Sequence, residues 1–228
     1  MTALIIGDSG IARSIAERFV ADGRAVATLA DASVFDDPAS AGAALGAAMA
    51  DDAVELVVYA HLDPAGFTTA PIISLTEQRW DDACERSLRH AFVALQQLHG
   101  LVADGTPIVL VLPEVAAVGV AGLVPLCSAV EGIRVLAKSA ARRWGGRSIT
   151  VNTIGVELAA FMLGAAEDHS DAEPQVPVPQ VPVLGSPALA PSPILDDVVG
   201  LIDLFASPAG RAVTGALLMA DRGTVMLP

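Results

Sequence analysis

Short, uninterrupted apolar runs alternate with amphipathic stretches along most of the chain. Such runs are typical of strands buried on both faces of a parallel sheet, whereas apolar positions three and four residues apart indicate helices. The pattern predicts strands at 3–6, 25–30, 54–60, 108–112 and 148–154, and a last strand and turn within 213–223. It predicts helices at about 11–21, 75–101, 125–145 and 193–207. This alternation predicts an α/β fold with a single doubly wound parallel sheet flanked by helices.

Length, composition and charge narrow the possible classes of protein. A chain of 228 residues, 53% of them hydrophobic, is long enough for one domain over residues 1–228 with a large core. The formal net charge of −13 argues against nucleic acid or an anionic membrane as a partner. The two cysteines, Cys84 and Cys127, have no disulfide or metal-site spacing, so we expect a reducing cytoplasm. The N-terminus has no basic region or cleavage site, so we expect no signal peptide.

One apolar run is as long as a membrane span. Residues 106–130 contain a single charged residue, Glu114, but Pro107, Pro113 and Pro125 interrupt the run. We therefore interpret it as a core strand, a loop and the start of a helix rather than as a bilayer helix.

The rest of the chain is organised around the stretch from Pro107 to Gly145. Its strand and loop lead into an amphipathic helix with an apolar face formed by Val130, Ile133, Leu136, Ala137, Ala140 and Ala141. In length and order these elements resemble the catalytic segment of the short-chain dehydrogenase/reductase superfamily. The resemblance extends over essentially the whole chain and includes the pair Val151-Asn152 and the final V-T-G…D pattern. It implies a Rossmann-like sheet and nicotinamide-dependent redox chemistry.

The catalytic positions of that superfamily carry other residues in this chain. The resemblance places the family's serine at Glu114, its tyrosine at Cys127, its lysine at Glu131 and its asparagine at Ser87. Cys127 is a poor substitute acid, because Glu131, one helical turn away, makes a thiol less acidic. Glu114 could act as an acid or base, particularly if burial raises its pKa. Glu114 and Glu131 would also repel each other in one pocket, so we expect one of them to stay protonated at neutral pH.

The turn after the first strand resembles the family's cofactor-binding turn but is one residue shorter. It consists of Gly7, Asp8, Ser9, Gly10, Ile11 and Ala12. A glycine turn before a helix leaves backbone N–H groups to meet a pyrophosphate, but Asp8 adds negative charge there. Asp31, after the second strand, either favours NAD over NADP or is a solvated carboxylate. We expect NAD(P) to bind weakly or not at all. In the second case these residues form only a tight turn between the strand and the helix.

His61 occupies the position of a family glycine at the end of the strand 54–60. Its imidazole either fills vacated space in the cofactor trough or is a functional group with a pKa near neutrality. A nucleophile pair of Cys127 and His61 is disfavoured, because no positive group that would stabilise a thiolate is evident nearby.

Two segments depart from the family in length or composition. Residues 31–38 lead almost directly to a helix start at Pro38, although a parallel crossover needs about a dozen residues. Either the second crossover helix is lost or the family's usual third strand is vestigial. Residues 165–193 are charged and then Pro-rich, and they form either a substrate-covering loop or a plain linker.

Three functions remain open at this stage. The first is a non-catalytic subunit that keeps the fold and partners an intact member of the superfamily. The second is a repurposed non-redox enzyme that uses Glu114, Glu131 and His61 for proton transfer or hydrolysis. The third is a divergent NAD(P)-dependent ketoreductase, which the loss of all four catalytic residues opposes. We favour the first.

The assembly that this choice requires is predicted to use the helices at about 75–101 and 125–145. In the superfamily, such helices pack as a four-helix bundle between subunits. The predicted contact residues, more apolar than a one-sided surface helix needs, are Leu88, Phe92, Leu95, Val135 and Leu136. A homo-oligomer would cover the same face as a hetero-oligomer with an intact relative.

Overall fold

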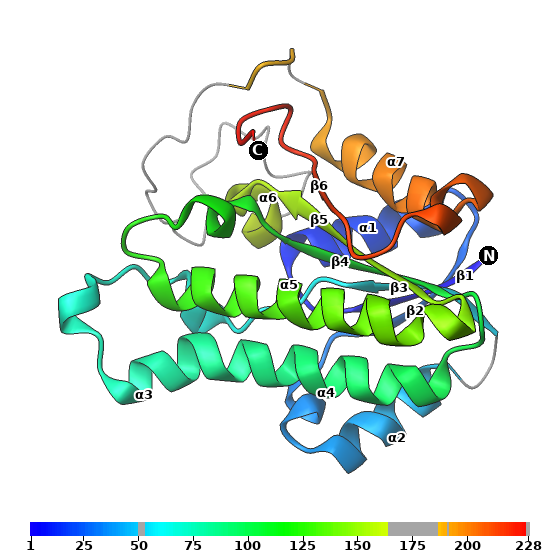
Figure 1. Cartoon of the computed structure of the whole chain (residues 1–228), viewed down its shortest axis with the longest axis horizontal. Helices are drawn as coiled ribbons and strands as arrows, with labels where there is room; N and C mark the ends of the chain where they lie inside the picture. The colour runs from blue at the N-terminus through cyan, green and yellow to red at the C-terminus, as the bar shows by residue number, and fades with distance from the viewer. Residues whose placement is uncertain (50–52, 164–186, 191, 227–228) are drawn as a thin grey trace.

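Six parallel strands form one sheet at the centre of the protein (Figure 1). The structure is a computed structural model that describes residues 1–49, 53–163, 187–190 and 192–226. The strands are β1 (Thr2–Ile6), β2 (Ala25–Leu29), β3 (Val54–Tyr59), β4 (Pro107–Pro113), β5 (Thr150–Val156) and β6 (Leu217–Met219). Their order is β2-β1-β3-β4-β5-β6, and each neighbouring pair is parallel. The predicted α/β fold class is confirmed.

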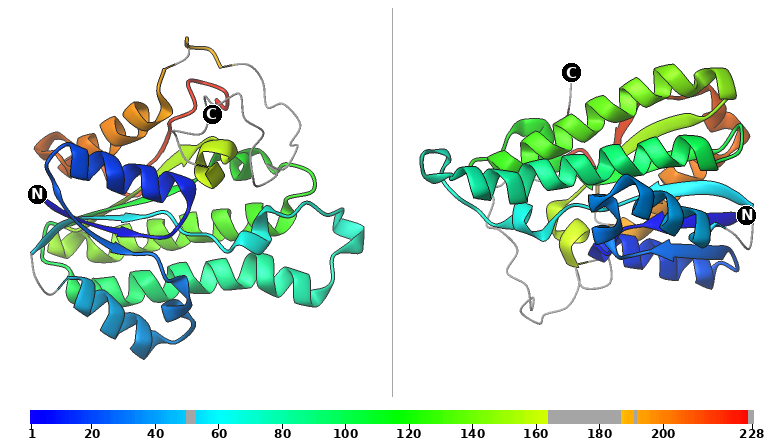
Figure 2. Two further views of the ribbon diagram at one scale, coloured as in Figure 1. Left: turned by 180° about the vertical axis from the view of Figure 1, so that it is seen from behind. Right: turned by 90° about the horizontal axis from the view of Figure 1, so that it is seen from below.

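Helices cover both faces of this sheet (Figure 1, Figure 2). One face is covered by α1 (Gly10–Ala21) and α7 (Ile194–Ala206), and the other by α2 (Pro38–Ala48), α4 (Arg86–Leu101) and α5 (Val124–Trp144). Because both faces are covered, every residue of β4 and β5 is buried, which explains their continuous apolar sequence. On α5 the predicted apolar face is buried, except for Leu136, which is half-buried.

The shorter elements connect these strands and helices. The 3₁₀ turns are η1 (Ala32–Asp36), η2 (Pro64–Phe67), η3 (Ile72–Ser74), η5 (Glu114–Val118), η6 (Gly145–Arg147) and η7 (Pro208–Ala212). The helix α3 (Glu77–Trp80) continues through a π-helical turn, η4 (Asp81–Glu85), into α4, and α6 (Leu158–Leu163) follows β5. The predicted helix at 75–101 is therefore a chain of three helical segments.

The connection from β2 to β3 contains η1 and α2 but no strand among its described residues. Pro38 occupies the first turn of α2, and the Asp37 side chain caps it by accepting a hydrogen bond from the Ser40 N–H at 2.8 Å. The structure thus fits the alternative in which the third strand is missing, since a crossover helix of eleven residues is present. As a result β2 forms one edge of the sheet.

Two other expectations were tested by the fold. Residues 106–130 form β4, η5 and the start of α5, as predicted, and no helix in the described ranges has the length and apolar character needed to cross a bilayer. The last strand is three residues long and lies within the stretch 213–223 that was predicted as a strand and turn. The Pro-rich segment 165–193 lies mostly outside the described residues.

Candidate functional site

An ionisable residue follows each strand at the carboxyl edge of the sheet. In order from β2 to β6 these residues are Asp31, Asp8, His61, Glu114, Glu157 and Asp221. Open parallel sheets usually bind their ligands at this edge. The carboxylates along this edge oppose a phosphate-containing ligand and favour a neutral or cationic one.

The predicted cofactor-binding turn is built from local contacts. Gly7 has a φ of +126°, and a Cβ added there would lie 2.5 Å from the carbonyl oxygen of Ala60. The Ser9 hydroxyl donates to that same carbonyl oxygen at 2.7 Å and accepts from the Ala12 N–H at 3.2 Å, which caps α1. The remaining residues of the motif, Gly10, Ile11 and Ala12, are buried in the first turn of α1. These contacts are sufficient for a tight strand–helix turn without a ligand.

Asp31, the predicted ribose-binding residue, caps η1. Its carboxylate accepts hydrogen bonds from the Ser33 N–H at 3.0 Å and from the Ser33 hydroxyl at 2.6 Å. These bonds hold the pKa of Asp31 below its ordinary value. The side chain is exposed and committed to this local turn, and its preference between NAD and NADP stays a prediction.

His61 belongs to a buried histidine pair that the sequence analysis missed. The His61 side chain is 3% exposed, and its Nε2 lies 3.1 Å from Nδ1 of His90 in α4. On the other side of His90, Nε2 lies 2.9 Å from Oδ1 of Asp36. On the other side of His61, Nδ1 lies 3.5 Å from Oδ1 of Asp8. His61 thus does fill space at the carboxyl edge, but as one member of a chain of four polar groups.

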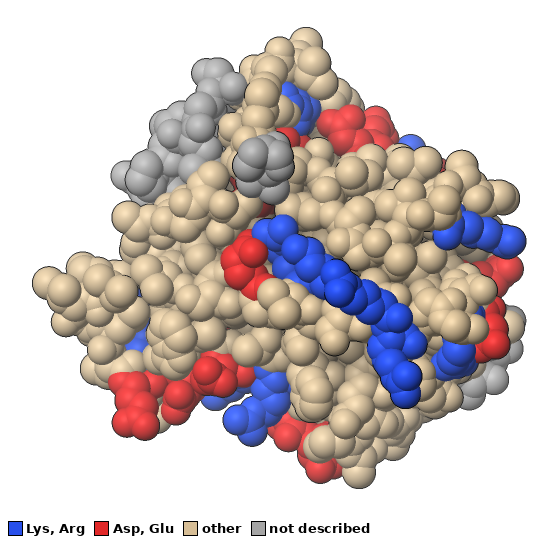
Figure 3. Space-filling view, in the orientation of Figure 1, with Lys and Arg blue, Asp and Glu red and all other residues tan. Residues whose placement is uncertain are grey.

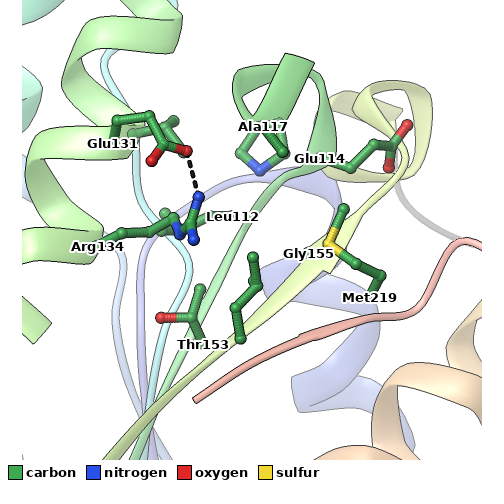
Figure 4. Close-up of a pocket in the computed structure, with 11 residues that line it drawn as sticks. Leu112, Glu114, Ala117, Glu131, Arg134, Thr153, Gly155 and Met219 are labelled. Carbon is green, nitrogen blue, oxygen red and sulfur yellow. Dashed lines mark hydrogen bonds and ion pairs between the residues drawn. The ribbon is translucent and has the colours of Figure 1, made fainter. Parts of the chain in front are cut away.

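Glu114 is a buried carboxyl group at the start of η5, with 6% of its surface exposed. Its Oε2 has no hydrogen-bond partner among the described residues, and Figure 4 shows the group pointing away from Arg134. Burial raises the pKa of Glu114 to about 8, and the carboxylates of Glu157 and Asp221 add to the effect. Burial thus favours the protonated form of Glu114, and the like charges that add to this effect come from Glu157 and Asp221.

Glu131 and Cys127 are held by contacts within the chain. Glu131 is ion-paired with Arg134, one turn further along α5 (Figure 4). The Cys127 Sγ lies 3.7 Å from the carbonyl oxygen of Val115. Burial raises the pKa of the Cys127 thiol, and the charge of Glu131 raises it further, in the predicted direction.

Ser87 connects α4 to the segment after β3. Its hydroxyl accepts a hydrogen bond from the backbone N–H of Asp63 at 2.9 Å. The Asp63 carboxylate in turn caps η2 through the Ala65 N–H at 2.9 Å and is paired with Arg86 at 3.2 Å. Ser87 therefore has a structural role next to the π-helical turn.

The cavity between β4, β5, β6 and α5 is small (Figure 4). Glu114, Glu131 and Arg134 line it, and its volume is about 10 Å³, which is room for about one water molecule. A substrate does not fit there. Within the described ranges, no three His, Cys, Asp or Glu side chains are arranged to hold a metal ion.

Comparison with known proteins gives a family match but no curated relative. A family model described as enoyl-(acyl carrier protein) reductase matches residues 43–225. No curated protein matches the chain in sequence.

Several solved structures have the same fold over nearly the whole chain. A short-chain dehydrogenase/reductase from Serratia marcescens is 21% identical with a TM-score of 0.70, over 98% of this chain and 96% of that chain. A dehydrogenase/reductase from Sinorhizobium meliloti is 23% identical with a TM-score of 0.74, over 98% and 94%. A short-chain dehydrogenase from Burkholderia cenocepacia, in complex with NADP, is 21% identical with a TM-score of 0.72, over 97% and 96%.

Proposed function

The chain belongs to the short-chain dehydrogenase/reductase superfamily, and we propose that it is a subunit without reductase chemistry that assembles with an intact member of the superfamily. The observation that carries this proposal is the pair Cys127 and Glu131 at the positions of the family's tyrosine and lysine. A buried thiol with a raised pKa beside a carboxylate is a poor proton donor to a carbonyl group. The carboxylate can accept a hydrogen bond from a ribose hydroxyl, but unlike an ammonium it raises the pKa of a neighbouring acid instead of lowering it.

The carboxyl edge supports weak or absent dinucleotide binding. Asp8, whose side chain is 57% exposed, lies directly before α1, where a pyrophosphate would meet the helix. His61 fills the place of the family's glycine, and its buried ring is held by His90. Asp31 is already bound to Ser33. Negative charge and occupied space at this edge thus both disfavour dinucleotide binding.

The exposed face of α4 and α5 supports assembly. Phe92 is 48% exposed and Val135 is 63% exposed, whereas Leu88 and Leu136 are half-buried and Leu95 is part of the core. Between the two helices lies a groove of about 300 Å³ whose apolar lining comes from Phe92, Leu95, Leu136 and Trp144. An exposed apolar surface of this kind is typical of an interface.

A band of basic residues runs along α5 beside this groove. Arg134, Lys138 and Arg142 follow one another at four-residue spacing, and Figure 3 shows the band across this face. In a chain with a net charge of −13 such a band is a local exception. It favours a partner surface with carboxylates opposite α5, which steers association and fixes orientation.

Co-expression with intact relatives encoded by neighbouring genes tests the assembly. We expect native mass measurement to find a stable complex of this chain with one such relative. A homo-tetramer that ignores every intact relative and turns over a substrate by itself would contradict the proposal.

Titration calorimetry with NADH and NADPH tests the cofactor part. We expect no binding in the low-micromolar range. The matched variant Asp8→Asn removes one charge at the helix start with little change in size, so it should bind no worse than the unaltered protein. Low-micromolar affinity of the unaltered protein would instead favour a working reductase.

Glu114 supports a second function, that of a repurposed non-redox enzyme. A buried carboxyl group that is protonated at neutral pH and has an unpartnered oxygen fits a general acid. Screening for hydrolase, lyase and isomerase activities, with Glu114→Gln as the matched inactive variant, tests it. An activity that survives this substitution would remove Glu114 from the mechanism.

A further inference from the structure

We propose that Asp8, His61, His90 and Asp36 form a one-proton latch, which fastens the turn after β1 and the segment 31–37 to α4 when the two imidazoles share one added proton. The inference concerns the carboxyl edge itself and is independent of the subunit role.

The four side chains form a continuous chain of polar contacts from one exposed end to the other. Asp8 and Asp36, at the ends, are 57% and 63% exposed, whereas both histidines are buried. The contacts are 3.1 Å between the histidines, 2.9 Å from His90 to Asp36 and 3.5 Å from Asp8 to Nδ1 of His61, an atom with no hydrogen-bond partner among the described residues. The residues come from the turn after β1, η1, the segment after β3 and α4, so this series of contacts links four separate parts of the fold.

The number of hydrogens on the two imidazoles decides which protonation state satisfies every contact in this series. Its three contacts each need one hydrogen, because both terminal carboxylates only accept. Two neutral imidazoles supply two hydrogens, so one contact lacks its hydrogen. One added proton supplies the third and satisfies all three contacts. A second added proton would bring a fourth hydrogen and place an N–H of His61 against an N–H of His90 across 3.1 Å, which is repulsive.

The surrounding charges agree with uptake of one proton and resistance to a second. Asp8, Asp36 and Asp63 are the carboxylates that face the pair, and all favour a positive charge on it. Two arginines offset them in part: Arg86 is paired with Asp63, and Arg13 donates to the carbonyl oxygen of Asp8. From β3, the ring of Tyr59 lies edge-on to His61 with 6.4 Å between centroids. Burial and the neighbouring His61 lower the pKa of His90, which opposes the second proton.

The latch has a consequence for the ligand-binding edge of the sheet. In the neutral state we assign the missing hydrogen to the contact between Asp8 and His61, because it is the longest of the three. Loss of the added proton therefore releases Asp8 and the turn that leads into α1. Uptake of the proton restores this contact and fastens the turn to His61. Access to the edge is thereby coupled to pH.

Nitrogen-15 NMR of the histidine rings in the full chain measures the proton count directly. Between pH 9 and pH 5, we expect the two rings of the pair to take up one proton in total. Uptake of two protons with ordinary midpoints, or of none, would overturn the proposal.

Hydrogen–deuterium exchange of peptides covering residues 7–12, the turn that the neutral state releases, tests the fastening. After correction for the intrinsic pH dependence of exchange, we expect about tenfold more protection in the protonated than in the neutral state. Asp36→Asn should abolish this difference, whereas Asp81→Asn, an exposed carboxylate outside the latch, should keep it. Asp8→Asn serves as the second latch variant if Asp36→Asn does not fold. An unchanged pH dependence in a folded latch variant would overturn the proposal.

Discussion

The carboxylate of Glu131 is ion-paired with the guanidinium of Arg134 on the next turn of α5. The positive group next to the family's lysine position is therefore neutralised by the residue at that position. Arg134 is held at this place, since it also lines the small cavity under α5 and its Nε is buried. Under the proposed assignment of Cys127 and Glu131 to the family's tyrosine and lysine positions, the centre has neither the phenol nor the lysine that would activate it.

Restoring the phenol alone should therefore not restore reductase chemistry. We expect Cys127→Tyr to show no NADPH-dependent ketone reduction, because the charge of Glu131 disfavours a phenolate one turn away. The assay follows NADPH oxidation with a panel of ketones, and Cys127→Phe is the control of matched size. Reduction by the tyrosine variant but not by the phenylalanine variant would contradict this account.

Glu114→Gln should stabilise the protein at neutral and alkaline pH. The unfolded chain ionises this carboxyl near 4.5, whereas the folded chain keeps its proton up to about 8, so the folded state loses stability as pH rises between these values. Removing the carboxyl should raise the free energy of unfolding by about 3 kcal/mol at pH 7 and by little at pH 4. Urea unfolding at pH 4, 7 and 9 measures this, with the exposed Glu17→Gln as control. An equal effect of Glu114→Gln at all three pH values would rule out the buried, protonated carboxyl.

Gly7→Ala should destabilise the fold whether or not a nucleotide binds. The added methyl would lie 2.5 Å from a backbone oxygen, and the φ of +126° is unfavourable for alanine. We expect a loss of about 2–4 kcal/mol in thermal or urea unfolding. Gly46→Ala in α2 is the matched control, because it meets no atom within 4 Å and should be neutral or slightly stabilising. A Gly7→Ala protein as stable as the control would mean that the turn is looser than described.

Charge placed on the face of α4 and α5 should prevent assembly. We expect the double variant Phe92→Asp and Val135→Asp to remain folded but to lose its partner in native mass measurement, because both side chains are largely exposed in the single chain. Val20→Asp on α1, which is 62% exposed on the opposite face, is the control and should leave the complex intact. If the Val20→Asp control lost its partner to the same extent as the double variant, an interface on the face of α4 and α5 would be contradicted.

Continuous apolar runs made most of the fold predictable from the sequence. β4 and β5 are buried at every residue, so their sequences are apolar throughout and their limits were predicted to within two residues. β6 lies within the stretch 213–223 that was predicted as the last strand and turn, and the residues before it are also hydrogen-bonded to β5, through Gly215 and Ala216. Among the described residues between β2 and β3 there is no strand, which was one of two alternatives, and only the observed elements and strand order decide between them.

The candidate site was predictable residue by residue but not as an arrangement. The positions of Glu114, Cys127 and Glu131 follow from spacing within one segment, whereas the neighbours that raise the pKa of Glu114 come from the ends of β5 and β6. His90 was missed because a histidine on the apolar side of a helix resembles a core residue. Its partner His61 is 29 residues away in the chain, and only the packing of α4 against the end of β3 brings the two rings together.

The position of β2 at the edge of the sheet also has a consequence for aggregation in solution. Its five residues, AVATL, include no charge and no proline, and its register with β1 is continuous without a bulge. Stable proteins usually protect such a strand, because its outer backbone groups can recruit a strand from a neighbouring molecule. In concentrated or heated solution, aggregation of this protein should therefore start at β2, and a lysine in place of the exposed Thr28 should keep more of it dispersed.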